Sequence, residues 1–228
     1  MSGPESMTMT QKPPNRCRLV LIAPQSRDLD TLAAQIEQAC GGGDVASLIL
    51  PQFDMLEAEF QDLAERIVPP TQARNIAVVI AGAPRIAARA KADGIHVDGP
   101  HADLADAISR YQPTMMVGAG GARDRDRALE LGELRPDYLF FGRFGYDSKP
   151  EPHPRNLALG RWWSEMIEIP CIVLAGSRIG SVVEVAQTGA EFVAASAAVF
   201  AEDADPQAAV AEINRLLDET VSARETPR

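Results

Sequence analysis

The chain has 228 residues, of which 46% are hydrophobic and 24% charged, values that are ordinary for a globular protein with a substantial core. Its formal net charge of −10 argues against a nucleic-acid binder and against adhesion to anionic lipid, because both need a basic surface. The sequence has no run of the roughly 18 apolar residues that a membrane span needs, and no apolar signal segment near residue 1. We therefore expect a cytoplasmic protein without nucleic-acid or membrane partners.

The cysteines are sparse and odd in number: Cys17, Cys40 and Cys171. They form no CxxC pair and have no metal-ligand spacing. Such a set suits a reducing compartment, and we expect buried or incidental thiols.

Eight short runs rich in Val, Ile, Leu or Phe recur along the chain, and both alternating sets of positions within them are apolar. This pattern is typical of parallel strands that are covered on both faces. The expected strands are residues 18–23, 46–50, 76–81, 94–97, 114–119, 138–142, 171–175 and 192–196.

Amphipathic stretches with helical spacing lie between these runs. The clearest helices are expected over residues 29–40, 55–67, 125–134, 181–189 and 206–221. Eight strand–helix units predict a closed (β/α)8 TIM barrel, and a doubly wound open sheet is the alternative. We expect a single barrel domain over residues 17–222, with a disordered N-terminal tail at 1–16 and a C-terminal tail at 223–228.

In such a barrel, chemistry is located on the loops that leave the carboxyl ends of the strands. The last two of these loops, "AGSRIGS" and "AASAAVF", are rich in small residues, and each leads into a helix whose N-terminus favours an anion. We predict that phosphate is bound here by Gly176, Ser177, Ala195 and Ser196. Tight turns with serine N-caps are the alternative.

The loop after the sixth strand, "GRFGYDSKPEPHPRN", is long and dense in polar residues. Long barrel loops often act as lids or substrate clamps, so Arg143 and Lys149 are predicted to contact the ligand, while the role of His153 stays open. A solvated polar loop is the alternative. In the preceding loop, "VGAGGARDRDRA", the third glycine of a dinucleotide motif is missing. We expect instead a glycine wall, including Gly118, that a ligand approaches closely.

The first three loops offer only Gln25, Gln52 and Arg85 as polar anchors, and Arg85 is expected at the surface. The fourth, in "ADGIHVDGPHADL", places Asp98, His101 and Asp103 within six residues. This cluster is either a metal or acid–base site, or a polar loop that caps the following helix.

Residues 78–200 resemble the thiamine phosphate synthase family, which includes thiazole tautomerases. "ADGIHV" is similar to its strand-4 signature, "SKPEP" occupies the place of its Thr-Lys-Pro loop, and "GAEFVAASAAVF" resembles its closing strand. The resemblance implies a (β/α)8 barrel in which His96 and Lys149 contact the ligand and Ser196 binds phosphate. Family members couple a hydroxymethylpyrimidine diphosphate to a thiazole phosphate, with Mg²⁺.

The motifs that supply magnesium and diphosphate contacts in the family are altered in this chain. The strand-2 Gln-Leu-Arg-Glu-Lys falls on "ILPQF", so that Ile49, Pro51 and Phe53 replace its Gln, Arg and Lys. The strand-3 Asn-Asp-Arg falls on "AGA", which leaves Ala81, Gly82 and Ala83. His101 stands where the second metal carboxylate belongs, and Ala122 replaces the tautomerase histidine. The cluster at 98–103 is therefore interpreted as a helix cap, with Asp103 near the helix N-terminus, and no resident metal is expected, although Mg²⁺ is not excluded.

Three functions remain open. The chain is a divergent enzyme of thiamine biosynthesis, and if active a synthase-like transferase; or a non-catalytic binder or regulatory relative; or another isomerase or lyase that uses His153, Lys149 or Asp98 as acid or base. Each predicts a small phosphorylated metabolite as partner, with the catalytic residues and the homo-oligomeric state left open.

Overall fold

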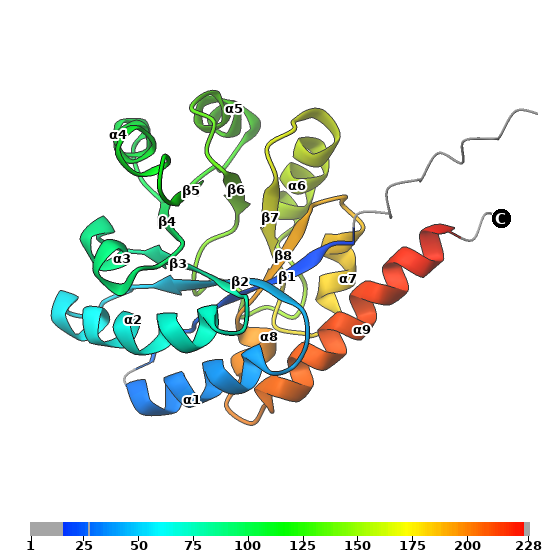
Figure 1. The fold of residues 1–228 in the computed structure, drawn as a ribbon. Coiled ribbons are helices and arrows are strands. Elements are labelled where there is room, and N and C mark those ends of the chain that lie inside the picture. Colours follow the sequence, from blue (N-terminus) through cyan, green and yellow to red (C-terminus); the bar gives the residue numbers. More distant parts are fainter. Residues whose placement is uncertain (1–15, 27, 226–228) are drawn as a thin grey trace, which may run out of the picture.

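The computed structural model describes residues 16–26 and 28–225, and it forms a closed barrel of parallel strands in the order β1 to β8 (Figure 1). Residues 1–15 and 226–228, where most of the expected tails fall, lie outside the described residues. The strands are β1 (Arg18–Ile22), β2 (Val45–Pro51), β3 (Ala77–Ala81), β4 (Gly94–Val97), β5 (Met116–Ala119), β6 (Tyr138–Phe141), β7 (Cys171–Leu174) and β8 (Phe192–Ala195).

Helices follow the strands and surround the barrel (Figure 1). They are α1 (Leu29–Cys40), α2 (Glu57–Gln72), α3 (Pro84–Ala90), α4 (His101–Tyr111), α5 (Arg125–Glu133), α6 (Pro154–Met166), α7 (Ser181–Ala186), α8 (Ala197–Phe200) and α9 (Pro206–Glu225). The start of α1 follows from its sequence, since the Asp28 carboxylate accepts the N–H groups of Asp30 and Thr31. At the first turn of α6, Pro154 needs no hydrogen-bond partner for its nitrogen.

The strands are buried on both faces, as the continuous apolar runs predict. Along β1, Leu19 and Leu21 pack toward the helices while Val20 and Ile22 belong to a separate cluster that fills the barrel. Ile49, Phe140 and other bulky residues from β2, β3, β6, β7 and β8 complete this inner cluster. The interior is therefore packed with side chains, so a ligand can bind only at the ends of the barrel.

At the amino-terminal end of the barrel, acidic side chains just before three of the strands accept hydrogen bonds from the backbone of the preceding strand. The carboxylates of Asp93 and Asp137, just before β4 and β6, each accept a backbone N–H from the preceding strand, Val78 and Val117, at 2.7 Å. Glu191, just before β8, does the same for the N–H of Cys171 at 3.0 Å. These bonds pair N–H groups at the strand starts, which indicates that this end serves stability.

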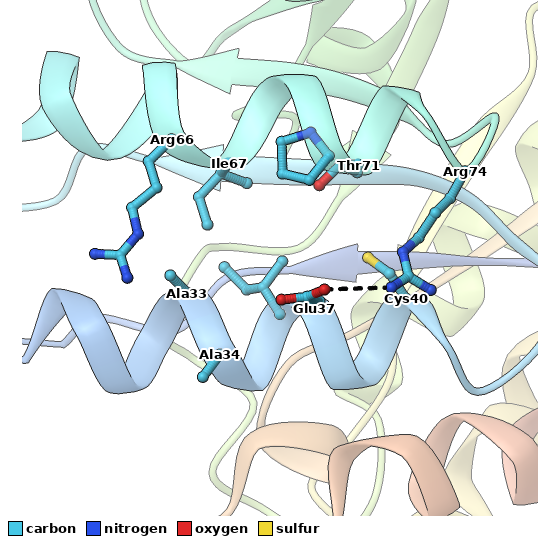
Figure 2. A pocket seen from close by; sticks show the side chains of 10 residues that line it. Ala33, Ala34, Glu37, Cys40, Arg66, Ile67, Thr71 and Arg74 are labelled. Atoms are coloured by element: carbon cyan, nitrogen blue, oxygen red, sulfur yellow. Dashed lines mark hydrogen bonds and ion pairs between the residues drawn. The ribbon is translucent and has the colours of Figure 1, made fainter.

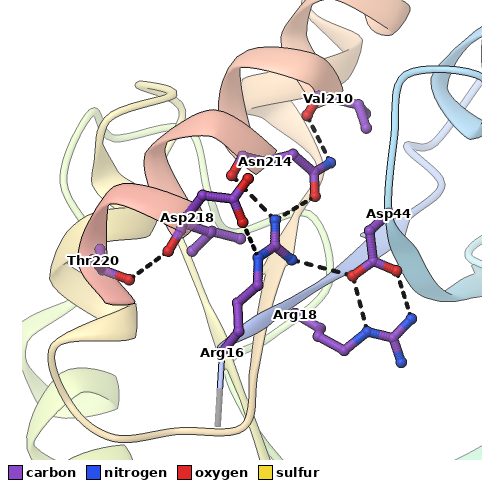
Figure 3. Close-up of polar contacts among 8 residues, drawn as sticks. Arg16, Arg18, Asp44, Val210, Asn214, Asp218 and Thr220 are labelled. Carbon is purple, nitrogen blue, oxygen red and sulfur yellow. Dashed lines mark hydrogen bonds and ion pairs between the residues drawn. The ribbon is translucent and has the colours of Figure 1, made fainter. Parts of the chain in front are cut away.

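Before β2, the equivalent acid binds arginines. Asp44 accepts hydrogen bonds from Arg16 and Arg18, and Arg16 also donates to Asp218 and Asn214 of α9 (Figure 3). The first described residue is thus tied to the last helix, whose backbone continues to Glu225, three residues into the segment expected as a tail. No described helix is long and apolar enough to cross a membrane.

Candidate functional site

Two adjoining hollows lie at the carboxyl ends of the strands. One has a volume of about 850 Å³ and is lined by residues after β2, β3 and β4 together with the loop after β6. The other, of about 1100 Å³, is lined by the loops after β5 and β6 and by the end of β7. They meet at Asp98, Arg143, Gly145 and Tyr146, which line both. This is the end of a barrel where substrates bind.

The first hollow is acidic, and we call it the acidic hollow. Its charged residues are four aspartates against one arginine, namely Asp54, Asp98, Asp103, Asp106 and Arg143. Asp106 pairs with Arg110, but among the described residues the other three aspartates have no ion-pair partner. Its remaining walls are strongly aromatic, with Phe53, Tyr111, Phe144 and Tyr146.

His96, on β4, also lines the acidic hollow and is buried. Its Nδ1 lies 2.9 Å from the hydroxyl of Tyr138, while its Nε2 is buried without a hydrogen-bond partner among the described residues. Nε2 faces the turn after β5, where a Cβ on Gly120 would lie 2.7 Å away, beside Asp98. Burial lowers the pKa of His96 to about 3, so the imidazole is neutral at physiological pH.

Aromatic rings enclose this imidazole. Phe144 packs its ring 5.1 Å from that of His96 and stacks at the same centroid distance on Phe140. The ring of Tyr138 stacks on that of His96 with their centroids 5.7 Å apart, and burial raises the pKa of the tyrosine hydroxyl, which stays protonated. Either tautomer of the neutral histidine therefore leaves Nε2 with one hydrogen bond to make.

The second hollow is basic, and we call it the basic hollow. Four basic residues, Arg123, Arg143, Lys149 and Arg155, line it against three acidic ones, Asp98, Asp147 and Glu151. Arg143 is exposed and lies over the ring of Tyr146, 3.9 Å from its centroid, at the border between the hollows. Lys149 is also exposed, so its ammonium can reach a ligand without first breaking an internal contact.

The loop after β6 binds the turns that follow β7 and β8. The Asp147 carboxylate is buried and accepts the N–H of Ala197, at the start of α8, at 2.6 Å. Two residues on, the Lys149 carbonyl accepts the N–H of Ser177 at 2.8 Å. The protein's own oxygen atoms therefore occupy two backbone donors in the turns predicted to bind phosphate.

The predicted site residues fall into two groups. His96, Arg143 and Lys149 line the hollows. Gly176, Ser177, Ala195 and Ser196 are packed behind the loop after β6: Gly176 has the Pro150 carbonyl 2.3 Å from its ideal Cβ position and donates its N–H to Ser181. Phosphate binding by these four residues remains a prediction, and it requires the loop to move.

Gly118 lines neither hollow. The ring of Tyr138 occupies the space beside it, where an added Cβ would lie 1.9 Å from the ring. Its lack of a side chain makes room for the tyrosine that contacts His96. Nothing in the sequence of the loop signals this role, because the tyrosine comes from the next strand.

The other polar candidates act locally. Asp103 lies in the first turn of α4 as predicted, although it makes no side-chain cap hydrogen bond, and His101 is the exposed first residue of that helix. The Nδ1 of His153 accepts the N–H of Arg155 at the start of α6. Arg85 is at the surface, as expected, and pairs with Glu57.

The residues at this end do not suit a Mg²⁺ ion. The described residues contain no group of three or more histidine, cysteine or acidic side chains arranged to hold a metal. Gly82, where the family resemblance places one metal ligand, has no room for a side chain, since a Cβ there would lie 2.8 Å from the ring of Phe60. Mg²⁺ needs several oxygen ligands in near-octahedral geometry, and we derive no step through it.

A smaller hollow of about 270 Å³ lies on the flank of the barrel between α1 and α2 (Figure 2). Glu37 and Arg74 pair across it at 3.4 Å. Burial raises the pKa of the Cys40 thiol to about 11, so it is no nucleophile at neutral pH. All three cysteines are buried, as predicted, and this hollow offers no chemistry comparable to that at the strand ends.

Several known proteins with similar sequences are thiamine-phosphate synthases. The family model described as thiamine monophosphate synthase matches residues 19–199. The thiamine-phosphate synthase of Rhodospirillum centenum is 32% identical over 202 residues, which cover 88% of this chain and 98% of that protein. The thiamine-phosphate synthase of Hyphomonas neptunium is 30% identical over 218 residues, covering 93% and 99%.

Solved structures agree on the fold. The thiamine phosphate pyrophosphorylase of Pyrococcus furiosus superposes with a TM-score of 0.74 at 20% identity, covering 90% of this chain and 98% of that one. The (S)-3-O-geranylgeranylglyceryl phosphate synthase of Thermoplasma acidophilum, in complex with sn-glycerol-1-phosphate, gives 0.61 at 15% identity, covering 87% and 93%. With a closed eight-stranded barrel and a family model that matches most of its length, this chain belongs to the thiamine monophosphate synthase family.

Proposed function

We propose that this chain binds a phosphorylated thiazole or a thiamine-phosphate-type ligand at the mouth of its barrel, within thiamine biosynthesis, and has largely lost Mg²⁺-dependent coupling. The observation that carries the proposal is the division of charge between the two hollows. Basic residues predominate beside the loop after β6, and acidic residues predominate beside β2, β3 and β4. A ligand with an anionic phosphate at one end therefore has one favourable orientation.

The phosphate end belongs in the basic hollow. Lys149 supplies an exposed point charge, and the turns at Gly176–Ser177 and Ala195–Ser196 lie directly behind the same loop. A phosphate would replace the Asp147 carboxylate as acceptor of the Ala197 N–H. Such an exchange is chemically conservative, because both groups are anionic oxygen acceptors.

Coupling chemistry is expected to be weak because the departing diphosphate would meet the acidic hollow. Pro51, Phe53, Ala81 and Gly82 line that hollow and offer neither positive charge nor a side-chain hydrogen bond. Removing one preorganised donor from an active site typically costs about 2.7–4 kcal/mol of transition-state stabilisation. Several such losses together would reduce turnover by many orders of magnitude.

The second candidate is a non-catalytic protein that binds a phosphate ligand. It is favoured by the same lack of charged and hydrogen-bonding side chains at Pro51, Phe53, Ala81 and Gly82. Both candidates need the phosphate contacts, and only the first needs turnover. An isomerase or lyase that uses His153 has less support, because that imidazole already accepts a backbone N–H.

The binding part is tested by calorimetry with thiazole phosphate on the parent protein and on Ser196→Asp. The added carboxylate should abolish binding by repelling the phosphate. The control is Ser109→Asp, which adds the same charge at an exposed position near the carboxyl end of α4. Equal affinity in Ser196→Asp and in the parent would remove the phosphate assignment.

The catalytic part is tested by incubating the protein with both substrates and Mg²⁺ and separating thiamine phosphate by chromatography. We expect turnover far below about 1 s⁻¹, the low end of ordinary enzymes. Turnover at or above that value would show that other residues perform the coupling.

A further inference from the structure

We propose that the outer face formed by α5 and α6 is a dimer interface, on which a second copy of this chain docks about a two-fold axis parallel to the two helices. The inference goes beyond the proposed function and depends on no ligand. It concerns the side of the barrel that lies away from α1 and α9 (Figure 1).

The two helices form one continuous surface. Gly132 of α5 packs against Trp163 of α6, since an added Cβ would lie 2.7 Å from the tryptophan ring. Leu129, one turn earlier on α5, and Trp162, the neighbour of Trp163, therefore stand at similar heights along the barrel. Because α9 packs against α1, α7 and α8, no described element covers this face.

Apolar side chains are concentrated on this face. Of the four large hydrophobic side chains that the described residues expose, Leu129 belongs to α5 and Met166 to α6, with 41% and 68% of their surface exposed. Trp162, one helical turn before Met166, is also partly exposed. The other two, Leu56 and Tyr146, lie on the loops after β2 and β6. Tryptophan and methionine are enriched in protein–protein interfaces.

The ring of Trp162 is held in place within the protomer. The Arg125 guanidinium lies over it, 5.0 Å from the ring centroid, and the ring of Trp163 meets it edge-on with the centroids 5.8 Å apart. A tryptophan that is already oriented loses little conformational freedom when a partner docks. This is the behaviour of an aromatic anchor at the centre of an interface.

The charges around these apolar residues are complementary between the two helices. On α5, the exposed Asp126 and Glu133 flank Leu129, and on α6 the exposed Arg161 precedes Trp162. None of the three charged side chains has an ion-pair partner among the described residues. The acidic edge of one copy therefore fits the basic edge of another.

Symmetry fixes the orientation of the second copy. Both helices run back from the carboxyl ends of their strands, so a two-fold axis parallel to them places α5 of one copy against α6 of the other. Leu129 then meets Trp162 of the partner subunit, and Glu133 meets Arg161 of the partner subunit, each twice. An axis perpendicular to the helices would place α5 against α5 and bring the acidic residues of the two copies together.

The size of the face predicts a weak dimer. With 9 and 13 residues, α5 and α6 are about 14 and 20 Å long, and packed helices have axes about 8–10 Å apart. A face of these dimensions suits an interface near the lower limit of about 1,200 Å² of total buried surface. We therefore expect a dissociation constant of about 10–100 µM, typical of a transient complex.

Sedimentation velocity on the full chain, from about 1 to 200 µM, tests the proposal across that range. The sedimentation coefficient of the parent should rise from that of a monomer towards that of a dimer. Leu129→Glu places a carboxylate at the centre of the face and should weaken the dimer about ten-fold or more. The matched control is Leu56→Glu, the same change at a leucine that is 69% exposed outside the face, which should leave the dimer unchanged.

An exchange of charges tests the pairing of α5 with α6. Arg161→Glu and Glu133→Arg each place like charges opposite one another and should weaken the dimer about three-fold or more. The double variant has the net charge of the parent and restores the pair with its signs reversed, so it should recover the parent's affinity. Because both residues are exposed, the variants should stay folded, which circular dichroism checks.

Three results would overturn the proposal. The first is a parent protein that remains monomeric at the highest concentration. The second is a Leu129→Glu dimer as tight as that of the parent, which would place the interface elsewhere. The third is a double variant no tighter than the two single variants, which would show that α5 does not face α6 of the partner subunit.

Discussion

The buried, neutral His96 should make the protein lose stability in mild acid. In the unfolded chain this imidazole titrates near its ordinary pKa of 6.5, whereas in the folded protein burial lowers the pKa to about 3. As the pH falls below about 6.5, the unfolded state binds a proton that the folded state does not, so the free energy of unfolding decreases until the pH approaches 3. Between pH 8 and pH 5 this linkage amounts to about 2 kcal/mol.

The perturbation is His96→Asn, which removes the titrating group while keeping a polar atom near the position that faces the Tyr138 hydroxyl. Urea unfolding at pH 8, 7, 6 and 5 gives the free energy of unfolding for both proteins. The variant is less stable at pH 8, and the gap to the parent should shrink by about 2 kcal/mol at pH 5. His101→Asn, at an exposed histidine, is the control. Parallel curves for the parent and His96→Asn would refute a neutral buried imidazole.

The other predictions concern the loop after β6 and the amino-terminal end of the barrel. Lys149→Ala should weaken thiazole-phosphate binding by about 1–3 kcal/mol, the scale of a charge-assisted hydrogen bond. Equal affinity of the variant and the parent in calorimetry would show that Lys149 does not contact the ligand. Asp147→Asn should have the opposite effect on affinity and tighten binding of thiazole phosphate. The amide oxygen still accepts the Ala197 N–H, whereas the negative charge that competes with the phosphate is gone. Unchanged or weaker binding would show that Asp147 does not occupy the phosphate position. Asp93→Ala leaves the Val78 N–H without its acceptor and should lower stability by about 1–3 kcal/mol in urea unfolding, against no change for Glu165→Ala. A loss below 0.5 kcal/mol, roughly that of an ordinary surface substitution, would show that the hydrogen bond from Val78 to Asp93 does not stabilise this end of the barrel.

The strands were predictable because most of their residues are apolar, and eight such runs followed by helices leave a closed barrel as the natural arrangement. Helix boundaries were less predictable. The structure continues α2 through Pro69 and Pro70 to Gln72, where a helix was expected to stop at residue 67. Burial of Val68 and Thr71 outweighs the local preference of proline.

The site was predictable only in part, because its residues belong to different loops. His96, Arg143 and Lys149 were found from strand-end position and resemblance, and they line the hollows. The contact between Asp147 and Ala197 joins residues 50 positions apart, and no local pattern signals it. The division of charge likewise appears only when the loops after β2, β3 and β4 are brought together by the barrel.

The most direct test of the division of charge between the acidic and the basic hollow is calorimetric titration with thiamine phosphate, thiamine and inorganic phosphate, each without Mg²⁺. Thiamine phosphate carries a cationic ring and a phosphate, so it should engage both hollows. We predict that it binds without metal and at least about a hundred-fold more tightly than either thiamine or phosphate alone, because the second contact is intramolecular. Failure to bind, binding only with Mg²⁺, or affinity no better than that of thiamine would contradict the account.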